Sequence, residues 1–293
     1  MSRENGFSNL PKDFATPGSW FLGQDRRYVV AEERTYVKRG TSSKILKAFD
    51  LRNDMVVAVK TLEEDAARDI NYRSMLFREG RAMSRFNHPN IVKFYDLVME
   101  RKGEINTPHI IMEFVDGESL LDRLRDDNQG PMTPDEIIDI SFQMASALDY
   151  IHKEGATHGD VKPNNILKSI DGAVKLTDFA NSNFVSLKNA RFFSPGYSAP
   201  EMALDRANTP STDLFSFVAT VYALVHNALP PDVAMKIEPQ FLDIRRYEIS
   251  NEANEGLKAL FRKGMAFDPS KRFYLCSVFA NRFANLFQNA KNL

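Results

Sequence analysis

The order of apolar and polar positions divides the chain into a strand-rich first part and a helix-rich second part. Short runs of β-branched and aromatic residues recur from position 28 to 60, separated by turn residues such as Arg52-Asn53-Asp54. From Asp65 to Phe86 the apolar spacing changes to three or four residues, as on one face of a helix. Two further strand-like runs follow at 91–98 and 109–114. This part predicts a small sheet with one helix.

Beyond Asp116-Gly117 the pattern becomes mainly helical. Thr133 to Glu136 forms a capping box with proline at the first helical position, which predicts a helix ending near His152. Two short strands at 165–167 and 174–176 flank Asp171-Gly172, a hairpin signal. Further helices are predicted at 213–227, 254–263 and 275–290. The predicted class is α+β, with a small antiparallel β-sheet lobe carrying one helix and a larger, mainly helical lobe.

Composition excludes several classes of protein. The 293 residues are enough for one large domain or two lobes. With 38 Lys and Arg against 39 Asp and Glu, the net charge of −1 gives no reason to expect nucleic acid or an anionic membrane as a partner. The N-terminus lacks the apolar run of a signal peptide, and the most apolar stretch, 214–229, is too short to span a bilayer. The single cysteine, Cys276, permits no internal disulfide, predicts a buried small side chain and favours a reducing, cytoplasmic setting.

The residues that predict chemistry lie in one stretch, from His158 to Asn165. Asp160 is suited to accept a hydroxyl proton, and Lys162 supplies a positive charge for a transferring phosphoryl group. Asn165 and, beyond the hairpin, Asp178 provide the oxygen ligands that Mg²⁺ prefers. Upstream, Val57 to Lys60 reads as a strand that ends in an inward-pointing lysine.

These motifs together resemble the eukaryotic-type (Hanks-type) serine/threonine protein kinases, from about Tyr28 to Phe279. The resemblance implies that Lys60 holds the ATP phosphates, that Glu79 pairs with it, and that 158–165 is the catalytic loop. Asp178-Phe179-Ala180 resembles the metal-binding triplet. Glu201, at the end of the activation segment, resembles the partner of Arg272, and Asp213 the buried aspartate at the start of the long helix.

The resemblance also implies a nucleotide site and an internal stack of side chains. Met112 takes the gatekeeper position, and Glu113 to Val115 the segment whose backbone holds adenine. Other ATP-binding residues are Lys38, Gly40, Ser43, Ile45, Ala58 and Leu167. The stack comprises Met83, Phe94, His158 and Phe179. The cofactors expected are ATP and Mg²⁺, with Mn²⁺ as an alternative metal.

The sequence departs from the family pattern at three places. Of the three glycines in the phosphate-covering loop only Gly40 is retained, with Ser43 as a small substitute. Ala180 ends the triplet where glycine is usual, and Gly159 replaces the arginine of the catalytic loop, which makes this a non-RD variant. Because glycine cannot pair with a phosphate, we expect phosphorylation of Ser182 or Ser186 to be unnecessary for activity, although Lys188 and Arg191 leave a contrary reading open.

Two rival functions remain at this stage. His-Gly-Asp also resembles small-molecule phosphotransferases such as aminoglycoside and choline kinases, and the poor glycine loop suits a catalytically silent scaffold. The segment from Phe193 to Glu201 resembles a peptide-docking segment and favours a protein substrate, and Lys162 together with Ser194 favours a serine or threonine acceptor. The expected partners are protein substrates and a regulatory protein. The expected organisation is a tail at 1–25 and a kinase domain at 26–290, divided into a small lobe (26–113), a hinge (114–118) and a large lobe (119–290).

Overall fold

The computed structural model describes residues 10–14, 19–23, 25–31, 36–39, 42–182, 194–203, 208–231, 241, 247 and 249–291. They belong to two compact units. The first contains the chain up to Asn87 together with Val92–Val115, and the second contains His88–Ile91 and the chain from Asp116 onward. The first is built on an antiparallel sheet and the second is mainly helical, as the strand-like runs and the helical spacing of apolar residues predict.

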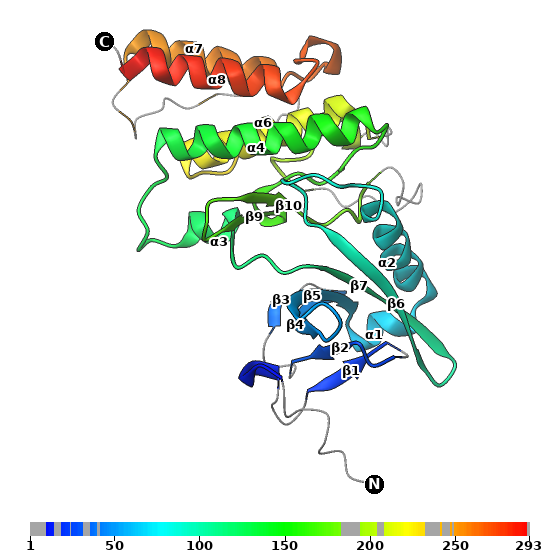
Figure 1. The fold of residues 1–293 in the computed structure, drawn as a ribbon. Coiled ribbons are helices and arrows are strands. Elements are labelled where there is room, and N and C mark those ends of the chain that lie inside the picture. The colour runs from blue at the N-terminus through cyan, green and yellow to red at the C-terminus, as the bar shows by residue number, and fades with distance from the viewer. Residues whose placement is uncertain are drawn as a thin grey trace. The chain divides into compact units, whose positions relative to one another are not determined.

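The first unit contains a seven-stranded antiparallel sheet in the order β1-β2-β4-β5-β7-β6, with β3 also pairing with β4 (Figure 1). Every pairing is antiparallel, and β4 and β5 pair along their whole length, from Ser43 opposite Leu62 to Asp50 opposite Met55. The strands are β1 (Trp20–Leu22), β2 (Tyr28–Val30), β3 (Tyr36–Arg39), β4 (Ser43–Asp50), β5 (Met55–Leu62), β6 (Phe94–Lys102) and β7 (Ile105–Glu113).

Strand β1 was not expected, because positions 19–23 show no alternation of apolar and polar residues. It forms because Leu22 is fully buried in the core of the sheet and Trp20 packs against the same core. The neighbouring strand β2 is fixed by polar bonds at its start. The Arg27 guanidinium donates to both oxygens of Asp50, at 2.8 and 2.6 Å, and the Tyr28 hydroxyl donates to Asp96 at 2.9 Å.

The first unit has two helices where the spacing predicted one. Helix α1 (Glu64–Arg68) ends at Asp69, whose backbone is extended, and α2 (Ile70–Met83) begins directly after it. The Asp69 carboxylate accepts the Asn71 backbone N–H at 2.8 Å and so caps the second helix. Helix α2 packs against β5, β6 and β7, and Gly80 permits this approach, since a Cβ there would lie 2.9 Å from the side chain of Leu97.

The second unit combines a three-stranded sheet, β10-β9-β8, with a bundle of helices. Helix α6 is buried along nearly its whole length and packs against α4, α7 and α8 (Figure 1). The elements are β8 (Gly117–Ser119), α3 (Leu120–Arg125), α4 (Pro134–Lys153), β9 (Ile166–Ser169), β10 (Val174–Leu176), α5 (Pro200–Ala203), α6 (Pro210–His226), α7 (Asn251–Gly264) and α8 (Cys276–Lys291).

Helix α6 begins three residues before the predicted start. Thr209 caps it by accepting the Thr212 N–H, the Thr212 side chain accepts the Thr209 N–H in return, and Pro210 takes the first position. Asp213 therefore lies in the first turn, where its charge is favoured by the helix dipole. Within the described parts of the chain, no helix is both long enough and apolar enough to cross a lipid bilayer.

Candidate active site

The first unit brings Lys60 and Glu79 together in a buried ion pair. Lys60 lies near the end of β5 and Glu79 in the second half of α2, and the Lys60 Nζ is 2.6 Å from the Glu79 Oε1. Their side chains are 9% and 3% exposed. Two buried charges this close restrain each other's side-chain conformation. The Lys60 ammonium group therefore has a fixed position beside the sheet.

The residues predicted to hold ATP in the first unit lie on adjacent strands. Ile45 pairs with Lys60 across β4 and β5, and Ala58 pairs with Met112 across β5 and β7. Ala58 and Met112 are buried. Glu113 is the last residue of β7, and its backbone N–H donates to the Lys93 carbonyl at 2.8 Å. Ser43 begins β4 and Lys38 lies in β3 opposite Ile45. Gly40 and the side chain of Lys38 lie outside the described part of the structure. Val115 is the last residue of the first unit.

In the second unit the catalytic loop is anchored by Asp213. The Asp213 carboxylate accepts the backbone N–H groups of His158 and Gly159, each at 2.7 Å, and lies 2.9 Å from the His152 Nε2. Burial alone would raise the pKa of the Asp213 carboxyl. The hydrogen bond and charge of His152, the charge of His158 and the Gly159 N–H stabilise the carboxylate by more than burial destabilises it. The pKa of Asp213 therefore lies below its usual value. The loop backbone is thus fixed from α6.

Asp160, Lys162, Asn165 and Ser194 form one hydrogen-bonded group. The Asp160 carboxylate lies 2.8 Å from the Lys162 Nζ and accepts the Asn165 amide at 3.0 Å. The Ser194 hydroxyl donates to the other Asp160 oxygen at 3.0 Å, and the Lys162 Nζ donates to the same hydroxyl at 3.0 Å. An aliphatic hydroxyl therefore already lies between a carboxylate that can take its proton and an ammonium group.

Asn165 and Asp178 suit a divalent cation. The Asn165 amide uses its nitrogen on Asp160, while its oxygen is buried and makes no hydrogen bond within the described structure. An amide oxygen of this kind is a ligand for Mg²⁺. Asp178 adopts a left-handed backbone conformation, with φ of +69°, which costs free energy for any residue but glycine and occurs at functional sites.

The segment that carries Asp178 is tied to the catalytic loop. The Thr177 N–H donates to the Asn165 carbonyl at 3.0 Å, and the Thr177 carbonyl lies 3.0 Å from the His158 Nε2. The His158 and Phe179 rings meet edge to face with centroids 4.7 Å apart, which is the contact expected for these two members of the predicted stack. Leu167 lies in β9 beside this loop.

Glu201 and Arg272 form a second buried ion pair. The Arg272 guanidinium donates to both Glu201 oxygens, at 2.7 and 2.8 Å, and lies over the Phe215 ring of α6 at 4.9 Å. This bidentate bond fixes α5, at the end of the segment that carries Ser194, against α6.

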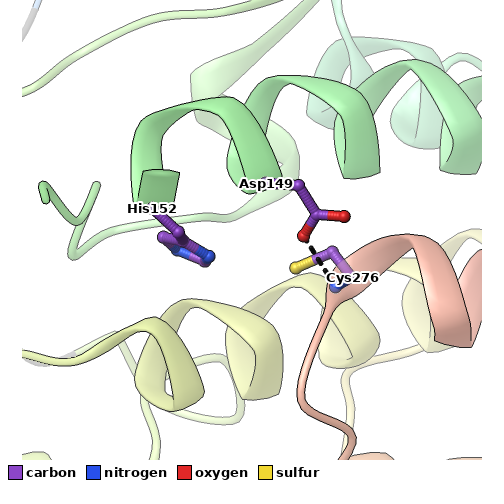
Figure 2. Close-up of side chains that lie close together, drawn as sticks. All are labelled: Asp149, His152 and Cys276. Atoms are coloured by element: carbon purple, nitrogen blue, oxygen red, sulfur yellow. Dashed lines mark hydrogen bonds between the residues drawn. The ribbon is translucent and has the colours of Figure 1, made fainter. Parts of the chain in front are cut away.

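Sequence reasoning missed His152, which lies in the last turn of α4 and helps to hold Asp213. Figure 2 shows it near Asp149 and Cys276, three residues with one ligand atom each within 4.8 Å of one another. The Asp149 oxygens accept the Cys276 and Ser277 backbone N–H groups, at 2.9 and 3.1 Å, which caps the start of α8.

Cys276 is buried where α8 begins, and burial raises the pKa of its thiol far above the usual value. The two bonds from Asp149 join α4 to α8. The prediction that Cys276 is buried is confirmed.

Known proteins resemble this chain over most of its length. The protein kinase domain family model matches residues 32–284. The serine/threonine-protein kinase PknB of Mycobacterium leprae is 32% identical over 245 residues, covering 80% of this chain and 39% of PknB. The serine/threonine-protein kinase PksC of Streptomyces coelicolor is 29% identical over 254 residues, covering 82% of this chain and 46% of PksC. The chain thus spans less than half the length of these relatives.

Solved structures agree in fold. The kinase domain of Mycobacterium tuberculosis PknI matches with a TM-score of 0.71 and 22% identity, over 93% of this chain and 99% of that chain. A second PknI kinase domain structure matches with a TM-score of 0.69 over 93% of this chain. The family match covers well over half of the sequence, so this chain belongs to the protein kinase family and has the α+β kinase fold predicted from its residues.

Proposed function

We propose that the protein transfers the terminal phosphoryl group of ATP to serine and threonine hydroxyls of other proteins. The observation that carries the proposal is the Ser194 hydroxyl between Asp160 and Lys162, at 3.0 Å from each. The same two groups can receive the hydroxyl of a substrate. Ser194 belongs to a segment just before α5, where a bound peptide would reach the catalytic loop.

In this proposal Asp160 is the group that accepts the proton of the acceptor hydroxyl. Its carboxylate already accepts the Asn165 amide, so its orientation is set before a substrate arrives. Lys162 remains beside it as a positive charge that balances the negative charge developing on the transferring oxygens. Neither group requires a large movement to perform these roles.

ATP and a divalent cation would supply the phosphoryl group and neutralise its charge. We assign the metal to the Asn165 amide oxygen and the Asp178 carboxylate, with Mg²⁺ as the physiological ion and Mn²⁺ as an alternative. We assign the phosphates to Lys60, held in place by Glu79, and the base to a surface that includes Ile45, Ala58 and Met112. Lys38, Gly40, Ser43, Glu113, Val115 and Leu167 complete the proposed nucleotide-binding set.

We further propose that this is a non-RD kinase, because Gly159 occupies the place of the arginine. A cytoplasmic setting, where ATP and a reducing environment are available, suits the one buried thiol. The partners are a protein substrate and a regulatory protein. The relatives PknB and PksC bear the name serine/threonine-protein kinase, which supports the choice of acceptor.

The test is incubation of the purified protein with labelled ATP, Mg²⁺, a general protein acceptor and a mixture of aminoglycosides. Label on serine and threonine of the protein is expected, and Asp178→Ala should abolish it. Label on the aminoglycosides would instead support a small-molecule phosphotransferase. Absence of label, together with no thermal stabilisation by ATP and Mg²⁺, would support a silent scaffold.

A further inference from the structure

Three segments of the second unit converge at Gly159. This residue has φ of +82°, and a Cβ there would lie 2.3 Å from the Asn181 carbonyl oxygen and 2.4 Å from the Asn208 side-chain nitrogen. Both distances are shorter than those that real Cβ atoms make with their neighbours, so a side chain at position 159 would displace one of the two asparagines. Glycine is therefore the residue that lets Asn181 and Asn208 lie against the catalytic loop.

Asn181 and Asn208 are joined by a hydrogen bond. The Asn208 side-chain nitrogen donates to the Asn181 carbonyl at 2.9 Å. Asn181 follows Asp178 by three residues, and the next residue closes a turn by donating from the Ser182 N–H to the Phe179 carbonyl at 3.0 Å. The bond from Asn208 therefore holds the third residue of a turn, Phe179 to Ser182, that begins directly after the strained Asp178.

Asn208 is itself held by the start of α6. It directly precedes Thr209, the residue that caps the helix in a reciprocal pair with Thr212. Asp213, in the same first turn, binds the backbone N–H groups of His158 and Gly159. One helix end thus holds the catalytic loop through Asp213 and the segment of Asp178 through Asn208.

The side-chain amide oxygens of Asn181 and Asn208 indicate that the contact between these two residues does more than stabilise the fold. Asn181 Oδ1 and Asn208 Oδ1 are both buried and have no hydrogen-bond partner in the described part of the chain. A buried amide oxygen without a partner lowers stability, and such groups need a separate reason in a native structure. An apolar pair would fill the space but would leave the Asn181 carbonyl unheld.

We propose that Asn208 is a positioning residue for the metal-binding segment: its bond to the Asn181 carbonyl holds Asp178 in its left-handed conformation, and Gly159 leaves room for that bond. The inference deepens the proposed function, since it concerns how the carboxylate assigned to the metal is held. Asn208 touches neither substrate nor metal and acts only through Asn181.

The first experiment is hydrogen exchange on the free protein, without nucleotide or metal, comparing wild type with Asn208→Asp. This substitution keeps the shape and replaces the donor with an acceptor that faces the Asn181 carbonyl. Loss of one hydrogen bond predicts exchange about fivefold to tenfold faster at residues 179–182. Helix α6, from Leu214 to Val225, should exchange as in wild type. Asn106→Asp, the same change on the exposed surface of β7, is the matched control.

The second experiment measures phosphoryl transfer against free Mg²⁺ at saturating ATP. Asn208→Asp should raise the half-saturating Mg²⁺ concentration about fivefold to tenfold and leave the KM for the protein acceptor unchanged. Gly159→Ala should also raise the half-saturating Mg²⁺ concentration, since its Cβ displaces the same bond, and the double variant should add little to that rise. If Asn208→Asp does not fold, Gly159→Ala carries both measurements.

Several outcomes would overturn the inference. Unchanged exchange at 179–182 in Asn208→Asp would show that the bond does not hold the segment, and faster exchange throughout α6 would reveal a general loss of stability. Additive effects of the two substitutions would also contradict it. If wild type transfers no phosphate, the proposed function fails, but the exchange experiment still decides whether Asn208 holds the segment.

Discussion

The Lys60 ammonium lies 2.6 Å from the Glu79 carboxylate, and both side chains are buried in the first unit. A buried charge that loses its partner is strongly destabilised, typically by about 3–5 kcal/mol. The pair is therefore a sensitive point both for the stability of this unit and for the direction of the lysine.

Glu79→Gln should raise the KM for ATP about tenfold or more, because Lys60 loses the charge that orients it. It should also lower the melting temperature. Steady-state kinetics and thermal unfolding measure the two effects. Glu64→Gln, in the exposed Glu64–Arg68 pair of α1, is the matched control and should change neither. An unchanged KM in Glu79→Gln would remove Lys60 from the proposed ATP-binding residues.

Asp160→Asn should lower kcat by about 10²–10⁴-fold, the usual contribution of a positioned general base. Nucleotide affinity should remain nearly unchanged, because Asp160 acts on the acceptor hydroxyl. Initial rates on a protein acceptor and calorimetric titration with ATP and Mg²⁺ separate the two quantities. Asp127→Asn, in an exposed loop, serves as the control. Retention of a tenth of wild-type activity would mean that another carboxylate takes the proton.

Phosphatase treatment and Ser182→Ala should leave the initial rate within about twofold of the untreated enzyme. Ser182 is fully buried, so its hydroxyl is not accessible for modification in this conformation. Gly159 has no side chain that could pair with a phosphate. Ser186, Lys188 and Arg191 lie outside the described residues, and Ser186→Ala is assayed in parallel. A tenfold drop in either variant or after phosphatase treatment would contradict the expectation and implicate Lys188 and Arg191.

Cys276 predicts a loss of stability at alkaline pH. Burial raises the pKa of its thiol in the folded state, whereas in the unfolded chain the thiol ionises at about 8.5. The unfolded state therefore releases a proton that the folded state keeps, so the contribution to stability is complete below that pH and declines above it. Relative to Cys276→Ala, wild type should lose up to about 1.4 kcal/mol per pH unit above pH 8.5. Urea unfolding of both proteins from pH 7 to 10 measures the difference, and parallel curves would refute the assignment.

Sequence reasoning reached those parts of the fold that local signals encode. Helix α4 was predicted almost to the residue because its capping box and its apolar face are both written in consecutive positions. The hairpin between β9 and β10 followed from Asp171-Gly172 in the same way. The break between α1 and α2 was missed, because Asp69 within a helical pattern looks like any exposed polar residue until its carboxylate caps the next helix.

In the candidate site too, contacts between residues close in sequence could be predicted and contacts between distant residues could not. Asp160, Lys162 and Asn165 lie within six residues, and their hydrogen bonds follow from that proximity. His152 and Asn208 could not be predicted, since each acts across a large sequence separation on a group of another element. Tertiary contacts of this kind leave no periodic signal, and only the folded chain reveals them.

The Asp213 carboxylate has a consequence for how the enzyme could be changed. It accepts hydrogen bonds from two successive backbone N–H groups of the catalytic loop and lies beside His152 of α4, while its own helix is buried along nearly its whole length. The catalytic loop is therefore attached to the buried helix α6 by its main chain, through bonds in which the side chains of Asp160 and Lys162 take no part. Residues such as Asp160 and Lys162 can be exchanged in an engineering experiment with the loop still in place, so a loss of rate in those variants reports on chemistry and not on a collapsed loop. Substitution of Asp213 itself would erase that distinction.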